Sequence, residues 1–284
     1  MSERHLRPAK RKDPLSVFLR VIVWVAAFLT VGVFVALVGY ILIKGVPNLT
    51  WDLFNPHYTS DNVSMLPAIF NTIFMTLLSL LVAVPLGISS AIYLTEYAKR
   101  GNKLVKVVRL TTETLQGIPS IVYGLFGYLF FLVQLKWGYS LLAGAMTLAI
   151  MILPLIMRTT EEAMLSVPDG YREGSFALGA GRLRTIFRIV LPTAIPGILA
   201  GVILAIGRIV GETAALIYTA GTYAQTADSL FSPVRTLSVH MYVLSSEGLH
   251  IDQAYATAAV LLIVVVGINA LSAAVAKSIT KRRG

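Results

Sequence analysis

Long stretches without charge constrain this chain more than any other feature. The first, from Val21 to Ile43, has 23 consecutive uncharged residues. At about 1.5 Å of rise per residue, a helix of that length crosses the roughly 30 Å hydrocarbon layer of a bilayer. It is too long for the core of a signal peptide, so we expect it to be retained. Similar apolar stretches recur at residues 67–94, 115–135, 139–157, 193–219 and 254–276. Together they predict an all-α membrane protein with six transmembrane helices.

The composition agrees with a membrane protein and excludes several other classes. Charged residues make up 13% of the 284 residues, about half the share of a soluble domain. The chain has no cysteine and its four histidines are scattered, so we expect no disulfide, bound metal or cofactor on it. No soluble stretch exceeds about 35 residues, and no Gly-x4-Gly-Lys-Ser/Thr phosphate loop occurs. We therefore expect a non-catalytic transport or signalling subunit, with any energy supplied by another chain.

Lysine and arginine are distributed unevenly between alternate connections. Of the 24 such residues, 20 lie in four segments, residues 1–20, 95–114, 158–192 and 277–284. The other three connections hold only Lys44, Lys136 and Arg235. Because basic residues accumulate on the cytoplasmic side of membrane proteins, both termini and the 158–192 loop are predicted to be cytoplasmic.

The net charge of +10 follows from this topology. The terminal cations are expected to contact anionic membrane lipid. No nucleic acid binding is expected, because the sequence shows no folded basic surface with interleaved aromatic side chains.

The 158–192 loop has a helical pattern of its own. The preceding span can continue as a helix through residues 158–167 and end at Pro168-Asp-Gly170. A short helix fits Tyr171 to Leu178, with a glycine stop after it. From residue 182 the pattern predicts a further helix along the membrane surface, with one apolar face formed by Leu183, Ile186, Phe187 and Val190. The short helix either docks in a groove of a cytosolic protein or is a solvated connector.

The spacing within this loop resembles a known signature. In ABC importer permeases, Glu-Ala-Ala is followed after three residues by Gly and after nine more by Ile-x-Leu-Pro. Here the loop reads Glu173-Gly-Ser, then Gly179, then Ile189-Val-Leu-Pro192, with every spacing kept. Gly-Ser replaces Ala-Ala, which keeps the side chains small but lowers helix propensity.

The resemblance implies an ABC type-1 importer permease fold with a cytoplasmic coupling helix. That helix would dock in a cleft of a dimeric cytoplasmic ABC ATPase, which would hold ATP and magnesium. The residues expected to couple the two proteins are Glu173, Gly174, Ser175, Ala177, Leu178, Gly179, Ile189, Leu191 and Pro192.

Two further stretches resemble the membrane subunits of phosphate importers. They are Gly207-Arg-Ile-Val-Gly-Glu-Thr-Ala-Ala215 and Gly117-Ile-Pro-Ser-Ile-Val-Tyr-Gly124. Residues 218–221 and 247–250 are more similar to the PstA-type subunit than to its PstC-type partner. The resemblance implies a complex in a bacterial inner membrane with a PstC-type permease, the ATPase dimer and an extracytoplasmic phosphate-binding protein, which imports inorganic phosphate.

Residues within the apolar spans are candidates for the substrate pathway. Arg208 and Glu212 lie in the 193–219 stretch, where a charge is costly unless it faces water or a partner. At spacing i,i+4 they can pair on one face of a helix. Arg208 either stabilises the subunit interface through that pair or offers its guanidinium to a tetrahedral oxyanion. Pro119 permits a kink that turns polar groups into the same cavity. The remaining pathway candidates are Ser120, Tyr123 and Thr213.

The predicted organisation is a basic tail (1–20), a first transmembrane helix (21–43), a permease core (66–276) with the coupling loop 158–192, and a second basic tail (277–284). Two alternatives stay open. One is an ABC permease for another oxyanion or small solute, since only the third and fifth spans bear on the substrate. The other is an ion-coupled carrier or channel, although six spans without an inverted repeat are few for a carrier.

Overall fold

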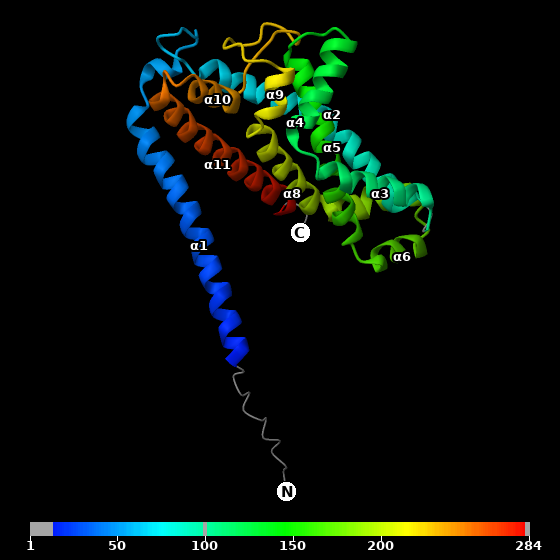
Figure 1. Ribbon diagram of the computed structural model, residues 1–284. Helices are drawn as coiled ribbons and strands as arrows, with labels where there is room; N and C mark the ends of the chain where they lie inside the picture. The colour runs from blue at the N-terminus through cyan, green and yellow to red at the C-terminus, as the bar shows by residue number, and fades with distance from the viewer. Residues whose placement is uncertain (1–13, 99–100, 282–284) are drawn as a thin grey trace.

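The structure, a computed structural model, describes residues 14–98 and 101–281, and within these ranges its regular elements are all helical (Figure 1). Some of the basic residues that are predicted to be cytoplasmic lie outside the described residues, namely Arg4, Arg7, Lys10, Arg11, Lys12, Lys99, Arg100, Arg282 and Arg283. The elements are α1 (Pro14–Gly45), η1 (Val46–Asn48), η2 (Trp51–Phe54), α2 (Leu66–Ile92), η3 (Tyr93–Tyr97), α3 (Lys103–Gln116), α4 (Ser120–Gly127), η4 (Tyr128–Gln134), α5 (Leu141–Leu165), α6 (Asp169–Ala177), α7 (Arg182–Thr185), η5 (Ile186–Val190), α8 (Leu191–Val210), α9 (Ala214–Thr219), α10 (Leu237–Glu247) and α11 (Ile251–Lys281).

The predicted all-helical membrane fold is confirmed. Five helices are long and apolar enough to cross a bilayer, and a sixth span results if the bent pair α3 and α4–η4 counts as one. In Figure 1, the beginning of α1, the end of α11 and helix α6 lie toward one end of the molecule, while α9 and α10 lie toward the other.

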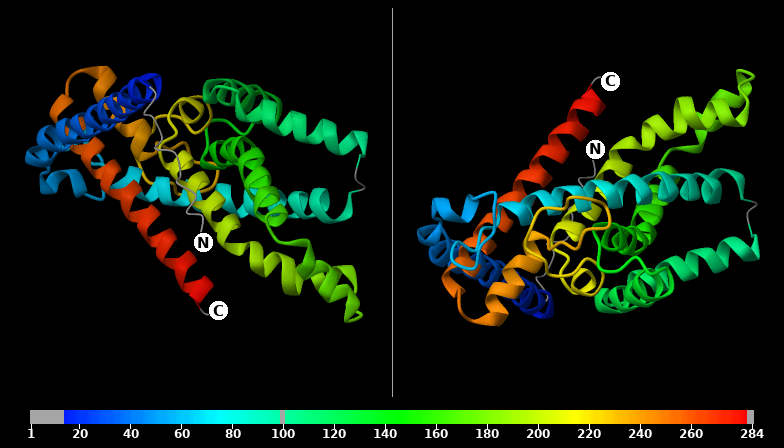
Figure 2. Two further views of the ribbon diagram at one scale, coloured as in Figure 1. Left: turned by 90° about the horizontal axis from the view of Figure 1, so that it is seen from below. Right: turned by 90° about the horizontal axis from the view of Figure 1, so that it is seen from above.

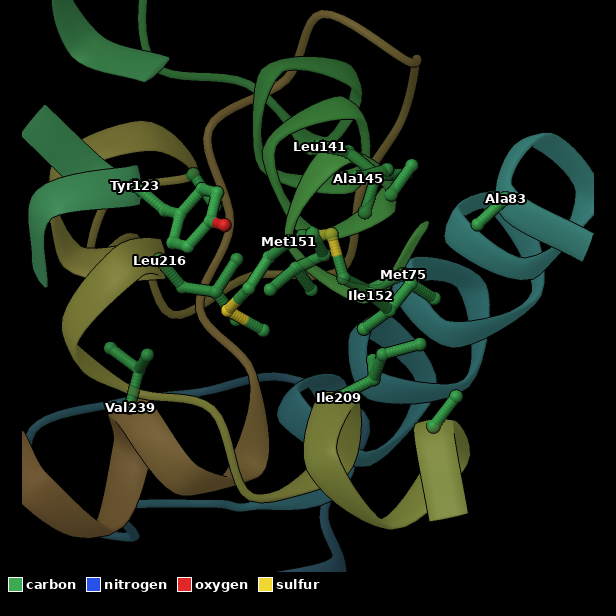
Figure 3. Packing of buried hydrophobic residues seen from close by; sticks show 14 of the residues in the cluster. Met75, Ala83, Tyr123, Leu141, Ala145, Met151, Ile152, Ile209, Leu216 and Val239 are labelled. Atoms are coloured by element: carbon green, nitrogen blue, oxygen red, sulfur yellow. The ribbon is translucent and has the colours of Figure 1, made fainter. Parts of the chain in front are cut away.

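Helix α5 forms the centre of the fold because it carries small residues where its neighbours approach. Gly144, for example, leaves space for the side chains of Met75 on α2 and Leu216 on α9. Around it, Met75, Leu148 and Ile152 are fully buried (Figure 3). Helix α1, in contrast, contacts α11 at its C-terminal end. Gly45 has no side chain, so α1 approaches the backbone of Tyr255 closely there. Toward its N-terminal end, α1 diverges from the body (Figure 1).

The third predicted span is bent rather than straight. Helix α3 ends at Gln116, helix α4 begins at Ser120, and the two axes meet at 102°. Pro119 is the residue before α4 and has an extended backbone. Its ring and its missing N–H interrupt the helix at this point. The predicted interruption at Pro119 is therefore confirmed, whereas a single helix over 115–135 is wrong.

The predicted surface helix from residue 182 is also wrong. Helix α7, the π-helical turn η5 and α8 follow one another without a break, so residues 182–210 form one helical span candidate. Of the predicted apolar face, Ile186 and Val190 are fully buried against the body, but Leu183 and Phe187 are exposed. The segment is the extension of α8, and its buried side chains attach it to the ends of α2 and α5.

The 220–253 connection contains more structure than its polar sequence indicates. It includes α10 and a buried arginine, Arg235, whose guanidinium carbon lies 4.5 Å from the centre of the Tyr58 ring. His240 of α10, to which the sequence assigns no role, is fully buried next to the same ring. Burial, together with the charge of Arg235, lowers the pKa of His240 to about 3, so its imidazole is neutral at pH 7.

Candidate functional site

Arg208 lies in the last turn of α8 and lines a groove between α8 and α11. The groove has a volume of about 660 Å³. In Figure 2, α8 and α11 lie side by side. Its lining is apolar except for Arg208 and one amide, and consists of Leu155, Ala200, Ile203, Leu204, Gly207, Arg208 and Asn269.

The guanidinium of Arg208 has no carboxylate partner among the described residues. Within residues 14–98 and 101–281, the ion pairs involve Arg109, Arg158 and Arg172 but not Arg208. An arginine at this depth in an apolar helix costs about 2.5–3.5 kcal/mol even on the milder insertion scales, so it is expected to face water or a ligand. The groove provides that opening, and the guanidinium of Arg208 lies on its largely apolar wall.

The predicted pair between Arg208 and Glu212 is wrong. Helix α8 ends at Val210, and residues 211–213 separate it from α9, so the two side chains are not one helical turn apart. Glu212 is buried, and its Oε1 accepts a hydrogen bond at 3.1 Å from the backbone N–H of Ala215 in the first turn of α9. Its carbonyl oxygen accepts from Ser238 Oγ of α10 at 2.6 Å. Glu212 thus satisfies a free N–H at the beginning of α9.

The other pathway candidates lie at helix interruptions. Thr213 is the residue that precedes α9, and Ser120 begins α4. Tyr123 is buried, and its hydroxyl donates to the carbonyl of Leu115 across the bend between α3 and α4, at 2.8 Å. It therefore stabilises the bend, and Figure 3 shows its ring among the core residues. Tyr123 also lies within electrostatic reach of Arg208.

Helices α4 and α9 pack closely because α4 carries glycines at the contact. A Cβ added at Gly124 would lie 2.8 Å from the Cα of Ala215, and one added at Gly127 would lie 2.7 Å from the Thr219 side chain. The contact brings the two interrupted spans together.

We expect Gly124→Ala to lower the free energy of unfolding by about 1–3 kcal/mol, because backbone must move to accept the new methyl group. The measurement is thermal unfolding of the detergent-purified chain. Gly32→Ala on α1 is the matched control, since nothing lies within 4 Å of its added Cβ. Equal melting temperatures for the two variants would contradict the close α4–α9 contact.

A short helix forms in the 158–192 loop as the sequence predicts, but it begins two residues before the predicted Tyr171 and ends one residue before Leu178. Helix α6 covers Asp169–Ala177, begins after Pro168 and ends before Gly179, whose φ of 81° suits glycine at a helix end. Its single buried residue is Ser175, whose hydroxyl lies 2.8 Å from that of Thr185 on α7. Apart from the half-buried Arg172, the other side chains of α6 are exposed, and Leu178, which follows the helix, is 90% exposed.

The predicted coupling residues separate into two groups. Glu173, Gly174, Ala177, Leu178 and Gly179 are exposed on α6 and its C-terminal turn. Ile189, Leu191 and Pro192, in contrast, are half-buried where α8 begins, and Leu191 packs against the cluster formed by the ends of α5 and α8. The first group is therefore open to solvent, while the second group lies where this segment joins the membrane helices.

Two residues near these sites were missed by the sequence reasoning. Asn269 shares the groove with Arg208, and its signal was present, as an amide in the otherwise apolar 254–276 stretch. Arg172 of α6 is half-buried and bonds to Glu96, a residue 76 positions away. No local pattern indicates that contact.

Comparison with known proteins agrees with the fold. Residues 83–284 match the family described as binding-protein-dependent transport system inner membrane component. The chain therefore belongs to this family, and it is a membrane-spanning permease subunit of an ABC importer.

Individual relatives cover most of the chain. It is 34% identical to the probable ABC transporter permease protein YqgI of Bacillus subtilis, over 78% of this chain and 81% of that protein. It is 35% identical to the phosphate transport system permease protein PstA of Pasteurella multocida, over 85% of both chains. Its fold is also similar to a chain of a bacterial ABC transporter involved in alginate import, with a TM-score of 0.66, 20% identity, and 94% and 95% of the two chains covered.

Proposed function

We propose that this chain is the PstA-type permease subunit of an ATP-driven importer of inorganic phosphate. The observation that carries the proposal is Arg208, a cation without a carboxylate partner on the wall of the α8–α11 groove. A guanidinium presents several N–H donors in a plane and binds tetrahedral oxyanions through two of them. The similarity to the phosphate permease protein PstA of Pasteurella multocida supports phosphate as that oxyanion.

The groove needs a second wall. It opens on the surface of the isolated chain, between two helices that face the membrane or a partner. We propose that a second, PstC-type permease covers it and that the ion crosses between the two subunits. Asn269, which contributes the amide in the groove, is then a second contact for the ion.

The remaining partners follow from the position of α6. We propose that a dimeric cytoplasmic ATPase, which holds ATP and magnesium, docks on the exposed residues of α6. An extracytoplasmic phosphate-binding protein delivers the ion at the other end, near α9 and α10. The charge distribution supports a bacterial inner membrane location, with both termini and α6 in the cytoplasm.

Glu212 is proposed to distinguish phosphate from sulfate. One oxygen of its carboxylate accepts from Ala215, and the other is free to accept a hydrogen bond from protonated phosphate. Sulfate is fully ionised and has no proton to donate. A carboxylate at this position could instead hold the Arg208 guanidinium toward the pathway. Since Glu212 does not pair with Arg208, we set that alternative role aside.

We expect Glu212→Gln to reduce the preference for phosphate over sulfate by about tenfold, because the loss of one charge-assisted hydrogen bond costs about 1.5–3 kcal/mol. The glutamine carbonyl still accepts from Ala215, so the beginning of α9 is preserved. The measurement is uptake of radioactive phosphate into proteoliposomes that contain the full complex, with sulfate as competitor. Unchanged uptake and unchanged preference would exclude Glu212 from the pathway.

A further inference from the structure

The guanidinium of Arg172 on α6 has polar partners on other segments of the chain. Its Nε and Nη2 donate to Oε1 of Glu96 at 3.1 and 2.9 Å. Its Nη1 and Nη2 also donate to the carbonyls of Val167 and Met164, at 2.8 and 3.0 Å. The Arg172 and Glu96 side chains are only 15% and 10% exposed. Because the ion pair is largely shielded from water, it is not comparable to a surface salt bridge.

These partners belong to the ends of two membrane helices. Glu96 lies in η3, the π-helical turn that ends the α2 span. The carbonyl of Met164 is in the last turn of α5, and that of Val167 follows it, where a helix leaves carbonyls without internal partners. Helix α6 is joined to α5 and to α7–α8 by short connections of the chain. The end of α2 has no such connection, since Glu96 and Arg172 are 76 residues apart.

A second contact holds the end of α2 from the other side of the coupling loop. The guanidinium of Arg182, the first residue of α7, lies 5.6 Å from the centre of the Tyr97 ring in η3. Ser175 and Thr185 join α6 to α7 by a hydrogen bond. The coupling helix is thus linked to three membrane helices, and Glu96 is its direct polar contact on α2.

We propose that Arg172 is a positioning residue that transmits the movement of the docked α6 to α2 through Glu96. The inference rests on the proposed docking of an ATPase on α6. Separating Arg172 from Glu96 would leave the shielded carboxylate of Glu96 without this partner, which is costly. The end of α2 and α6 therefore move together when the ATPase closes, and the movement reaches the core helix α2 without a covalent connection.

The test is Glu96→Gln in the complete complex, reconstituted in proteoliposomes. This change removes the ion pair with Glu96, while the carbonyls of Met164 and Val167 and the carboxylate of Asp169 still accept from Arg172. We expect phosphate imported per ATP hydrolysed to fall at least about fivefold, the lower end of typical couplings between sites. ATP hydrolysis and co-purification of the ATPase stay within about twofold of the unchanged complex, as for substitutions that leave the docking surface intact.

The control is Glu113→Gln, which removes a carboxylate that is 69% exposed and 3.8 Å from Arg158. It should leave the import per ATP unchanged. A parallel fall of import and hydrolysis in Glu96→Gln, or an unchanged ratio, would overturn the proposal. If the unchanged complex hydrolyses ATP but imports no phosphate, the proposed substrate fails, and the next measurement still tests the role of Arg172.

That measurement is the distance between spin labels at Tyr93→Cys, the first residue of η3, and Tyr171→Cys, on α6. Both side chains are exposed, and the chain has no other cysteine. With Glu96 present, pulsed EPR should give one narrow distance in the nucleotide-free and the ATP-bound complex. With Glu96→Gln, the distribution should broaden or differ between the two states. A distance that already changes with nucleotide when Glu96 is present would overturn the proposal.

Discussion

Arg208→Gln is expected to reduce phosphate uptake about a hundredfold or more, while the complex still assembles. The structure gives the reason, because the Arg208 guanidinium has no carboxylate partner and lines the α8–α11 groove. The substitution therefore breaks no ion pair of the fold. It removes the charge and the paired donors that would replace the water around a passing anion, and loss of such a contact costs about 2–5 kcal/mol. The measurement is uptake of radioactive phosphate into proteoliposomes.

Two further variants make this test specific. Arg208→Lys keeps the charge but loses the planar pair of donors, so its uptake should lie between the wild-type and Arg208→Gln values. Lys44→Gln, at the exposed end of α1, is the control for the loss of one positive charge and should import normally. If Arg208→Gln prevented co-purification of the partner subunits, the arginine would instead stabilise the subunit interface.

Leu178→Asp is expected to abolish the association with the ATPase without an effect on the fold of this chain. Leu178 follows α6 and is 90% exposed, so its replacement disturbs no internal contact. In a docked complex, burial of this side chain would contribute about 1.5–3 kcal/mol, and an aspartate there would place a charge in an apolar contact. The measurement is the yield of ATPase that co-purifies with the tagged permease.

The matched control is Leu165→Asp at the end of α5. Leu165 is 59% exposed and lies outside α6, in the part of the loop that precedes it. This variant should retain the ATPase. Equal retention of the ATPase by Leu178→Asp would show that the exposed surface of α6 is not the docking site.

The parts of the fold that follow from local chemistry were predictable from the sequence. Length and the absence of charge identify the apolar spans, because a helix must satisfy its own backbone in lipid. The bounds of α6 were also accessible, since Pro168 and Gly179 have a conformational reason to interrupt a helix. These signals depend on a few neighbouring residues.

The parts that depend on tertiary contacts were not predictable. The stretch from 193 to 219 is apolar and reads as one helix, so Arg208 and Glu212 were expected to pair. In the structure, Glu212 bonds to the beginning of α9, and the helix is interrupted before it. Likewise, Pro119 indicates an interruption but not the angle of 102°, and the contact of Arg172 with Glu96 joins segments that are remote in sequence.

The most direct test of the proposed function is ATP hydrolysis by the purified complex in proteoliposomes, with the phosphate-binding protein on the outer side. We predict that phosphate stimulates hydrolysis and is imported, that sulfate does neither, and that Arg208→Gln removes the import. Stimulation by another solute but not by phosphate, or phosphate import by this chain without an ATPase, would contradict the account.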